Sequence, residues 1–220
     1  MDTSAARKAI FSRIRSAQNR PADSAPAEQE AVHDYLGQHS RGPLPTVGSD
    51  LVAHFRQQAQ RMSDTVAEVQ TMADVPSAVA QYLDEIGAAR HAIAWKTLDG
   101  LDWQGGGLNV EFRPPRNEDM VSITGAFCAV AETGSLMLLS GPQTYSSAAL
   151  LPETHIAIVP ASRIVAHMED AFVLARSECG ELPRAVNFIS GPSRTGDIEQ
   201  TIVLGAHGPY RVHVVLVRDA

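Results

Sequence analysis

Three stretches of the sequence bring together side chains that could bind or transform a small ligand. They are residues 131–135 (Ala-Glu-Thr-Gly-Ser), residues 189–200 (Ile-Ser-Gly-Pro-Ser-Arg-Thr-Gly-Asp-Ile-Glu-Gln) and residues 205–209 (Gly-Ala-His-Gly-Pro). Each combines glycine with a titratable or hydroxyl side chain, next to an apolar run. Because a strand or helix fixes the ends of such loops, they are common places for binding and catalytic residues.

The second stretch offers the clearest chemistry, the binding of an anion. Ser193 and Thr195 supply hydroxyl donors, and Arg194 supplies a guanidinium that can hold a carboxylate or phosphate through two hydrogen bonds. A helix expected over 197–204 would also direct its N-terminal N–H groups toward the ligand. The spacing therefore suits a small anionic ligand.

The same loop has an equally good structural explanation. Asp197 and Gln200 make a capping pair that would satisfy those N–H groups internally, so cap and ligand site are equally supported by the residues alone. Asp197 and Glu199 lie two positions apart. Side chains at that spacing on a helix point in different directions, which argues against joint acid–base action on one atom.

The other two stretches each contain a candidate for proton transfer. In the first, Gly134 permits a turn, and Glu132 and Thr133 could face a ligand; a turn capped by Thr133 is the simpler alternative. In the third, His207 lies between glycines and could titrate near neutral pH or orient a ligand oxygen. A histidine that is merely exposed in a turn is the alternative there.

Composition excludes several classes of protein. The 18 Lys and Arg against 25 Asp and Glu give a net charge of -7, which opposes binding to a nucleic acid. No apolar run reaches the ~20 residues that span a bilayer, and no signal peptide is visible at the N-terminus. Two distant cysteines, Cys128 and Cys179, and no histidine pair at ligand spacing predict no disulfide framework and no metal site. We expect a cytoplasmic protein.

The elements that must position these loops follow from the apolar pattern. Short apolar runs predict strands at 65–69, 91–95, 121–124, 135–139, 155–159, 186–189 and 212–217. Helices are expected at 51–62, 76–86, 125–131, 144–150, 168–179 and 197–204. Apolar strands that alternate with helices indicate an α/β domain with a mixed, mostly parallel sheet, in which ligands bind at the carboxyl ends of the strands.

The first 50 residues differ from the rest. A basic helix is predicted over 4–18, followed by a Pro- and Gly-rich arm over 19–50 that is expected to be extended. The positive charge is more typical of a solvated helix face than of a docking surface. We therefore divide the chain into an arm, residues 1–50, and one α/β domain, residues 51–220.

Taken together, the motifs in residues 131–136, 155–160, 189–199 and 204–209 resemble the lactate-utilisation (LUD-type) domain family. The resemblance covers roughly residues 60–218. It implies a fold similar to the sugar-phosphate isomerase and coenzyme A transferase group, and a role in oxidising L-lactate to pyruvate together with partner proteins that carry iron–sulfur clusters. The lack of cysteine ligands in this chain agrees with clusters on partners. Ser135 and the Thr154-His155 pair depart from the residues frequent in the family.

Carried onto matching positions, the resemblance implies a site that binds a small anion and moves protons. Its members are Glu132, Thr133, Gly134, Ser193, Arg194, Thr195, Asp197, Glu199, His207 and Gly208. Glu132 and His207 are the candidate catalytic residues, and the others bind the ligand. Two hypotheses remain: an accessory subunit of a lactate-oxidising assembly whose arm docks iron–sulfur partners, or a stand-alone enzyme acting on a phosphorylated, acyl or carboxylate metabolite. A homo-oligomer is compatible with either.

Overall fold

The computed structural model describes residues 3–21, 23–196 and 201–220. Contacts within the chain divide it into two units, Met1–Leu44 and Pro45–Ala220. The first unit consists of the helices α1 (Ser4–Ala17) and α2 (Pro26–Gln38), neither of which buries a side chain. The helix predicted over 4–18 is therefore confirmed.

Helix α2 corrects the prediction of an extended arm over 19–50. Pro26 stands in the first turn, where the N–H that proline lacks would have no partner in the helix. Residues 27–36 contain neither proline nor glycine and are rich in Ala, Glu, Gln and Leu, which favour helices. The overall Pro and Gly content of the arm concealed this helical segment.

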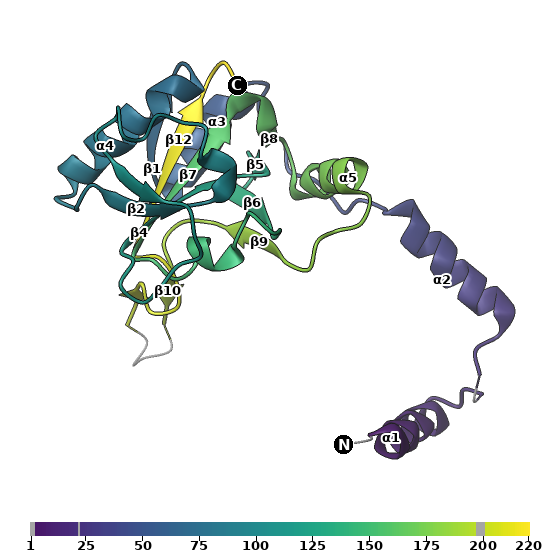
Figure 1. The fold of residues 1–220 in the computed structure, drawn as a ribbon. Coiled ribbons are helices and arrows are strands. Elements are labelled where there is room, and N and C mark those ends of the chain that lie inside the picture. Colours follow the sequence, from purple (N-terminus) through teal and green to yellow (C-terminus); the bar gives the residue numbers. More distant parts are fainter. Residues whose placement is uncertain (1–2, 22, 197–200) are drawn as a thin grey trace. The chain divides into compact units, whose positions relative to one another are not determined.

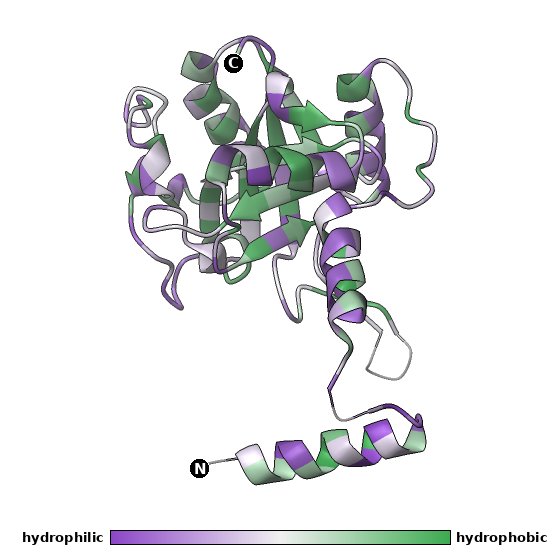
Figure 2. Ribbon diagram, turned by 90° about the vertical axis from the view of Figure 1, so that its right-hand side faces the viewer, coloured by the Kyte–Doolittle hydropathy of each residue, from purple (hydrophilic) through white to green (hydrophobic). Residues whose placement is uncertain are grey.

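Six parallel strands form the central sheet of the second unit, in the order β1-β12-β7-β4-β2-β3 (Figure 1). Their bounds are β1 (Thr65–Val69), β2 (His91–Ala94), β3 (Asn109–Glu111), β4 (Val121–Gly125), β7 (Thr154–Pro160) and β12 (Arg211–Val217). The inner strands are almost entirely buried, as expected of a parallel sheet covered on both faces. Figure 2 shows these strands as hydrophobic and the surrounding turns as largely hydrophilic. The predicted α/β fold is confirmed.

A smaller mixed sheet lies beside the first, in the order β8-β5-β6-β9. Its strands are β5 (Cys128–Val130), β6 (Ser135–Leu139), β8 (Ile164–Val165) and β9 (Val186–Ile189). β6 pairs antiparallel with β5 and β9, and β5 pairs parallel with β8. The strands predicted at 135–139 and 186–189 therefore exist but belong to this second sheet.

Three long helices pack on the sheets. α3 (Leu51–Arg61) contacts β1 and β8 and buries Phe55 and Ala59, so it bridges both sheets. α4 (Val75–Glu85) packs on β1 and β12. α5 (Met168–Cys179) packs on β5 and β8 over a separate apolar cluster that includes Cys128 and Met137.

Three other expected helices are wrong in whole or in part. Residues 125–131 contain strand β5, and in 144–150 only the 3-10 turn η3 (Ser146–Ala149) forms. Of the helix expected at 197–204, residues 197–200 lie outside the described part, 201–202 are irregular and β11 (Val203–Leu204) pairs antiparallel with β10 (Arg194–Thr195). Apolar runs this short do not distinguish helix from strand by periodicity, and pairing with distant segments decides their conformation.

Candidate functional site

The first two predicted loops meet at the C-terminal end of α3, where two glycines make close contact possible. Gly134 has φ +68°, and a Cβ there would lie 2.4 Å from the backbone nitrogen of Ala59. Gly191 has φ +81°, and a Cβ there would lie 2.3 Å from the carbonyl oxygen of Met62. Any larger residue would therefore clash with the backbone and adopt a strained conformation.

A chain of hydroxyl groups joins the same two loops. Thr133 Oγ1 lies 2.7 Å from Ser135 Oγ, which in turn lies 2.6 Å from Ser190 Oγ. The pairing of β6 with β9 places Ile189 opposite Leu136, and this brings Ser190 beside Ser135. Ser135 is buried and Ser190 is exposed, so the hydrogen-bonded hydroxyl groups lead from the interior at Ser135 to the surface at Ser190.

The β10–β11 hairpin brings the third loop to the second. The Ser193 backbone N–H donates to the carbonyl of Pro209, and the Gly205 N–H donates to the carbonyl of Ser193, each at 2.9 Å. Gly208 lies against Ser193, whose Cβ would be 3.2 Å from a Cβ at position 208. Thr195 pairs with Val203 across the hairpin. The structure therefore gathers parts of all three predicted stretches.

Arg194 fixes this hairpin to the end of α3. Its Nη2 donates to the carbonyl oxygen of Met62 at 3.1 Å and to Ser63 Oγ. Ser63 has φ +75°, a left-handed conformation that serine seldom adopts and that lets the chain turn sharply from the helix into β1. The guanidinium of Arg194 is thus anchored to backbone rather than displayed on a free loop.

Directly after this turn lies Asp64, a buried acid that the sequence did not single out. The residue is 5% exposed, and neither carboxylate oxygen has a hydrogen-bond partner within the described part of the chain. Burial raises the pKa of Asp64 to about 7, although the positive charge of Arg194 acts in the opposite direction. Unpartnered buried carboxyl groups with raised pKa values are characteristic of functional sites.

Glu132 is in hydrogen-bond contact with His167, a residue outside the predicted site. Its Oε2 lies 3.0 Å from Nδ1 of His167, and both side chains are largely buried. The backbone N–H of Glu132 also donates to the carbonyl of Ala166 at 3.0 Å. His207, the other predicted catalytic residue, is exposed in the turn after β11. The structure thus places Glu132 against the start of α5.

Neither residues 189–196 nor residues 201–204 form the helix N-terminus that was predicted to assist anion binding. Asp197 and Glu199 lie outside the described residues. On either side of them the chain forms β10 and β11 rather than a helix. A ligand at this loop would rely on side chains and hairpin backbone, because no helix dipole is directed at it from residues 201–204.

Asp64, His167 and Ser190 were missing from the predicted site for different reasons. Ser190 belongs to a stretch that the sequence did single out, and only sheet pairing reveals its contact with Ser135. His167 directly precedes a predicted helix, but its partner is 35 residues away in the sequence. Asp64 lies in a turn between a predicted helix and a predicted strand, and its burial cannot be predicted from the residues around it.

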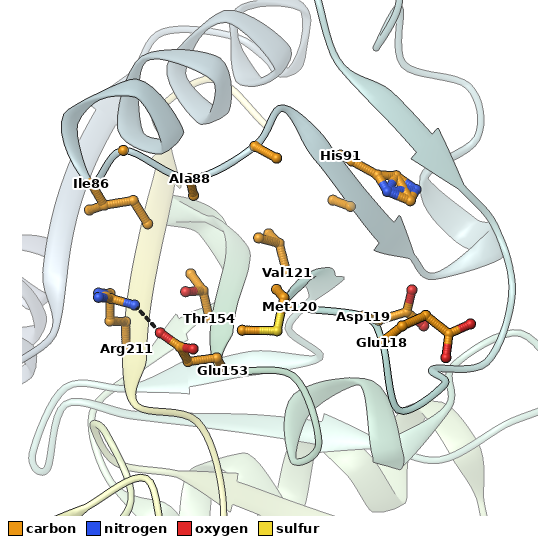
Figure 3. A pocket seen from close by; sticks show the side chains of 13 residues that line it. Ile86, Ala88, His91, Glu118, Asp119, Met120, Val121, Glu153, Thr154 and Arg211 are labelled. Carbon is orange, nitrogen blue, oxygen red and sulfur yellow. Dashed lines mark hydrogen bonds and ion pairs between the residues drawn. The ribbon is translucent and has the colours of Figure 1, made fainter.

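A different cavity, of about 420 Å³, lies at the amino ends of the central strands (Figure 3). Three of its charged side chains are paired: Arg211 with Glu153 at 2.5 Å, and Asp119 with Arg113 at 2.6 Å. Figure 3 shows the first pair on the floor of the cavity beside Thr154. Among the residues that the structure describes, no predicted site residue lines it.

Next to Thr154, His155 is completely buried. Its Nε2 lies 2.8 Å from Thr124 Oγ1, and its Nδ1 has no partner among the described residues. Burial lowers the pKa of His155 to about 4, so the imidazole is neutral near pH 7. This histidine is part of the core of the central sheet.

Within residues 3–21, 23–196 and 201–220, no group of three or more His, Cys, Asp or Glu side chains is arranged to hold a metal ion. In the same part of the chain, no helix combines the length and apolar character needed to cross a membrane. Both cysteines are free; Cys128 is buried and Cys179 is exposed.

A parallel sheet flanked by helices, with loops that gather hydroxyl groups, an arginine and a buried acid, defines an α/β domain with a candidate ligand-binding site. The LUD domain family matches residues 52–217, and this chain belongs to that family. A protein of Deinococcus radiodurans described as a DUF162 family protein has a similar fold, with a TM-score of 0.57 and 23% identity. The similarity covers 79% of this chain and 99% of that protein.

Several related proteins are named lactate utilization protein C. The Exiguobacterium sp. protein is 30% identical over 225 residues, covering 97% of this chain and 96% of its own length. The Bacillus subtilis protein is 36% identical over 136 residues, which cover 56% of this chain and 57% of that protein. The Shouchella clausii protein is 43% identical over 101 residues, so the matched part of this chain spans 44% of that relative's length.

Proposed function

We propose that this chain acts in the utilisation of L-lactate as an accessory subunit that binds a small carboxylate, while partner proteins carry out electron transfer. The observation that carries the proposal is the similarity to lactate utilization protein C of Exiguobacterium sp., which extends over 97% of this chain. A relationship along nearly the whole length supports a shared role better than a shared fold alone would.

The residue types that meet in the three loops support the binding of a small carboxylate such as lactate. Arg194 provides the charge-assisted hydrogen bonds that a carboxylate prefers, and its side chain is already oriented by Met62. Ser190 is exposed and lies at the outer end of the hydrogen-bonded hydroxyl groups of Thr133, Ser135 and Ser190. Asp64 lies behind them and is influenced by the charge of Arg194, but its carboxylate oxygens are buried and do not reach the loop surface.

The electron carriers are proposed to be iron–sulfur clusters on partner chains. A cluster needs about four cysteine ligands, whereas this chain has two cysteines, one buried and one exposed. Two free thiols also fit a reducing compartment, and we place the protein in the cytoplasm. In this scheme the chain contributes ligand binding and docking surface to an assembly.

Growth on L-lactate tests the proposal. We expect a strain of the source organism that lacks this chain to grow on pyruvate but not on L-lactate, and the wild-type chain to restore growth. Arg194→Ala should fail to restore it. Arg218→Ala is the matched control, because Arg218 is also a partly exposed arginine but pairs with Glu68 elsewhere. Both variants should be shown to unfold at the wild-type temperature.

Normal growth of the deletion strain on L-lactate would overturn the proposed role. If Arg194→Ala restores growth on L-lactate as well as the wild-type chain does, the role in lactate utilisation stands but the assignment of the binding site is wrong.

A stand-alone enzyme acting on a phosphorylated, acyl or carboxylate metabolite is the second candidate. The observation that favours it is Asp64, because a carboxyl group with a pKa about 7 is suited to both accept and donate a proton near neutral pH. Turnover of such a metabolite by the purified chain, lost in Asp64→Asn, would support this function over the accessory role.

A further inference from the structure

The topology of the central sheet points to a second place for a ligand. The chain leaves β2 toward β3, on one side, and leaves β4 toward β7, on the other, although β2 and β4 are neighbours. In open parallel sheets, ligands bind at the carboxyl ends of the strands where successive connections diverge in this way. The divergence between β2 and β4 therefore marks the expected crevice.

The structure has a cavity of about 350 Å³ at this position. Trp95 and Thr97 line it after the end of β2, Gly125 and Phe127 at and after the end of β4, and Cys179 and Glu181 at the end of α5. None of these residues belongs to the loops that meet at the end of α3. The cavity is thus separate from the candidate lactate site, and a ligand bound in it would be independent of the proposed function.

Two aromatic side chains on the walls of this crevice are held in place. The Trp95 indole N–H donates to the carbonyl of Tyr145 at 3.0 Å. The Phe127 ring is covered by the guanidinium of Arg163, 4.7 Å from the ring centroid. Between them, a Cβ added at Gly125 would meet nothing within 4 Å in the described part of the chain, so open space extends to the backbone of β4.

The charge of the lining excludes an anion. Among the described residues, Glu181 is the one charged residue on the walls, and no Lys, Arg or His lines the cavity. The charge of nearby Arg163 is neutralised, because its guanidinium donates to Glu178 Oε1 and Oε2 at 2.6 and 2.9 Å and to the carbonyl of Phe127 at 2.9 Å. A carboxylate or phosphate would find no cationic partner on these walls.

We propose that the crevice at the carboxyl ends of β2 and β4 binds a flat, uncharged aromatic molecule of two or three fused rings. Such a ring system can pack against the partly exposed ring of Phe127 and against the small part of Trp95 that reaches the cavity. A volume of about 350 Å³ lies within the range of small-molecule sites. The hydroxyl of Thr97 provides a polar group for an edge of the ring.

Lumiflavin and flavin mononucleotide test this proposal because they share one fluorescent ring system and differ by a charged ribityl phosphate. Titration of the full chain should give saturable quenching of lumiflavin, with flavin mononucleotide binding about tenfold more weakly or less. Gly125→Val fills the open space and should weaken lumiflavin binding by about tenfold. Gly48→Val, at a glycine with equally open surroundings outside the cavity, should leave it unchanged.

Chemical modification of Cys179 gives a second readout on the unsubstituted chain. Cys179 is exposed and lines the cavity, whereas Cys128 is buried, so a maleimide should modify Cys179 selectively. Lumiflavin should slow this modification. The proposal is overturned if lumiflavin neither binds nor protects Cys179, if Gly125→Val folds and binds as tightly as the wild type, or if flavin mononucleotide binds more tightly than lumiflavin.

Discussion

Asp64 shows how one side chain can connect stability with the candidate site. Its carboxyl group is 5% exposed with no hydrogen-bond partner among the described residues, so ionisation is costly in the folded chain. The pKa rises from 3.8 to about 7 on folding. A carboxyl group in such an unfavourable setting does not contribute to stability when ionised, which makes Asp64 a candidate for a functional role.

This raised pKa predicts a specific pH dependence. Because the folded state holds the proton more tightly than the unfolded state, Asp64 has no destabilising effect below about pH 4. The free energy of unfolding falls as the pH rises from about 4 to about 7, by on the order of 4 kcal/mol. Asp64→Asn should remove most of this fall, measured by urea unfolding at pH 5 and pH 8.

Asp119→Asn serves as the contrasting variant. Hydrogen bonds from Arg113 lower the pKa of Asp119, so its ionised form stabilises the fold above its ordinary pKa, and that contribution is lost as the pH falls. This substitution should therefore destabilise the chain at pH 8. Parallel pH profiles for the wild type and Asp64→Asn would contradict the burial of an unpartnered carboxyl group.

At the scale of elements, long segments with strong apolar patterns were predicted correctly. Five strands of the central sheet and helices α3, α4 and α5 lie close to their predicted bounds, whereas β3 and the short strand β8 were not predicted. The short strands β5, β10 and β11 were missed, because their conformation comes from pairing with other segments rather than from their own residues. The described end of the helix expected at 197–204, residues 201–204, is not helical for the same reason.

The candidate site was also predictable only in part. Residue types and loops could be predicted from sequence, as the Thr133, Ser193 and Gly208 neighbourhoods show. The contacts between loops could not, because they depend on the register of β6 with β9 and on the approach of both loops to α3. The sequence singled out Glu132 as a candidate catalytic residue, but its contact with His167 follows from the packing of α5 and could not be predicted.

The packing of α3 against the turn before β6 depends on Gly134. Gly134→Ala requires a left-handed conformation of alanine and a Cβ 2.4 Å from the Ala59 nitrogen, so the turn and α3 must separate. We expect a loss of more than about 2 kcal/mol in the free energy of unfolding. Gly48→Ala, where a Cβ meets nothing within 4 Å in the described part of the chain, should change it by less than about 0.5 kcal/mol. Equal unfolding midpoints for the two variants would disprove the close contact.

At the scale of the whole molecule, the two units have different characters. Every residue of both apolar clusters lies at or after Val47, so the second unit contains the complete core of the described residues. Helix α1 carries Arg7, Lys8, Arg13 and Arg15 without an acidic residue, on a chain whose net charge is -7. Its Ile10, Phe11 and Ile14 are 59%, 42% and 45% exposed. A basic helix with exposed apolar side chains suits the docking of an acidic partner protein.

Affinity purification of the tagged chain from cells grown on L-lactate tests the accessory role in lactate utilisation most directly. We expect the full chain to bring with it proteins whose iron–sulfur absorption is bleached by L-lactate. Residues 45–220 alone should retain cooperative unfolding but recover much less of these proteins. If the full chain instead purifies without cluster-bearing partners, and by itself turns over a metabolite, the accessory role is contradicted.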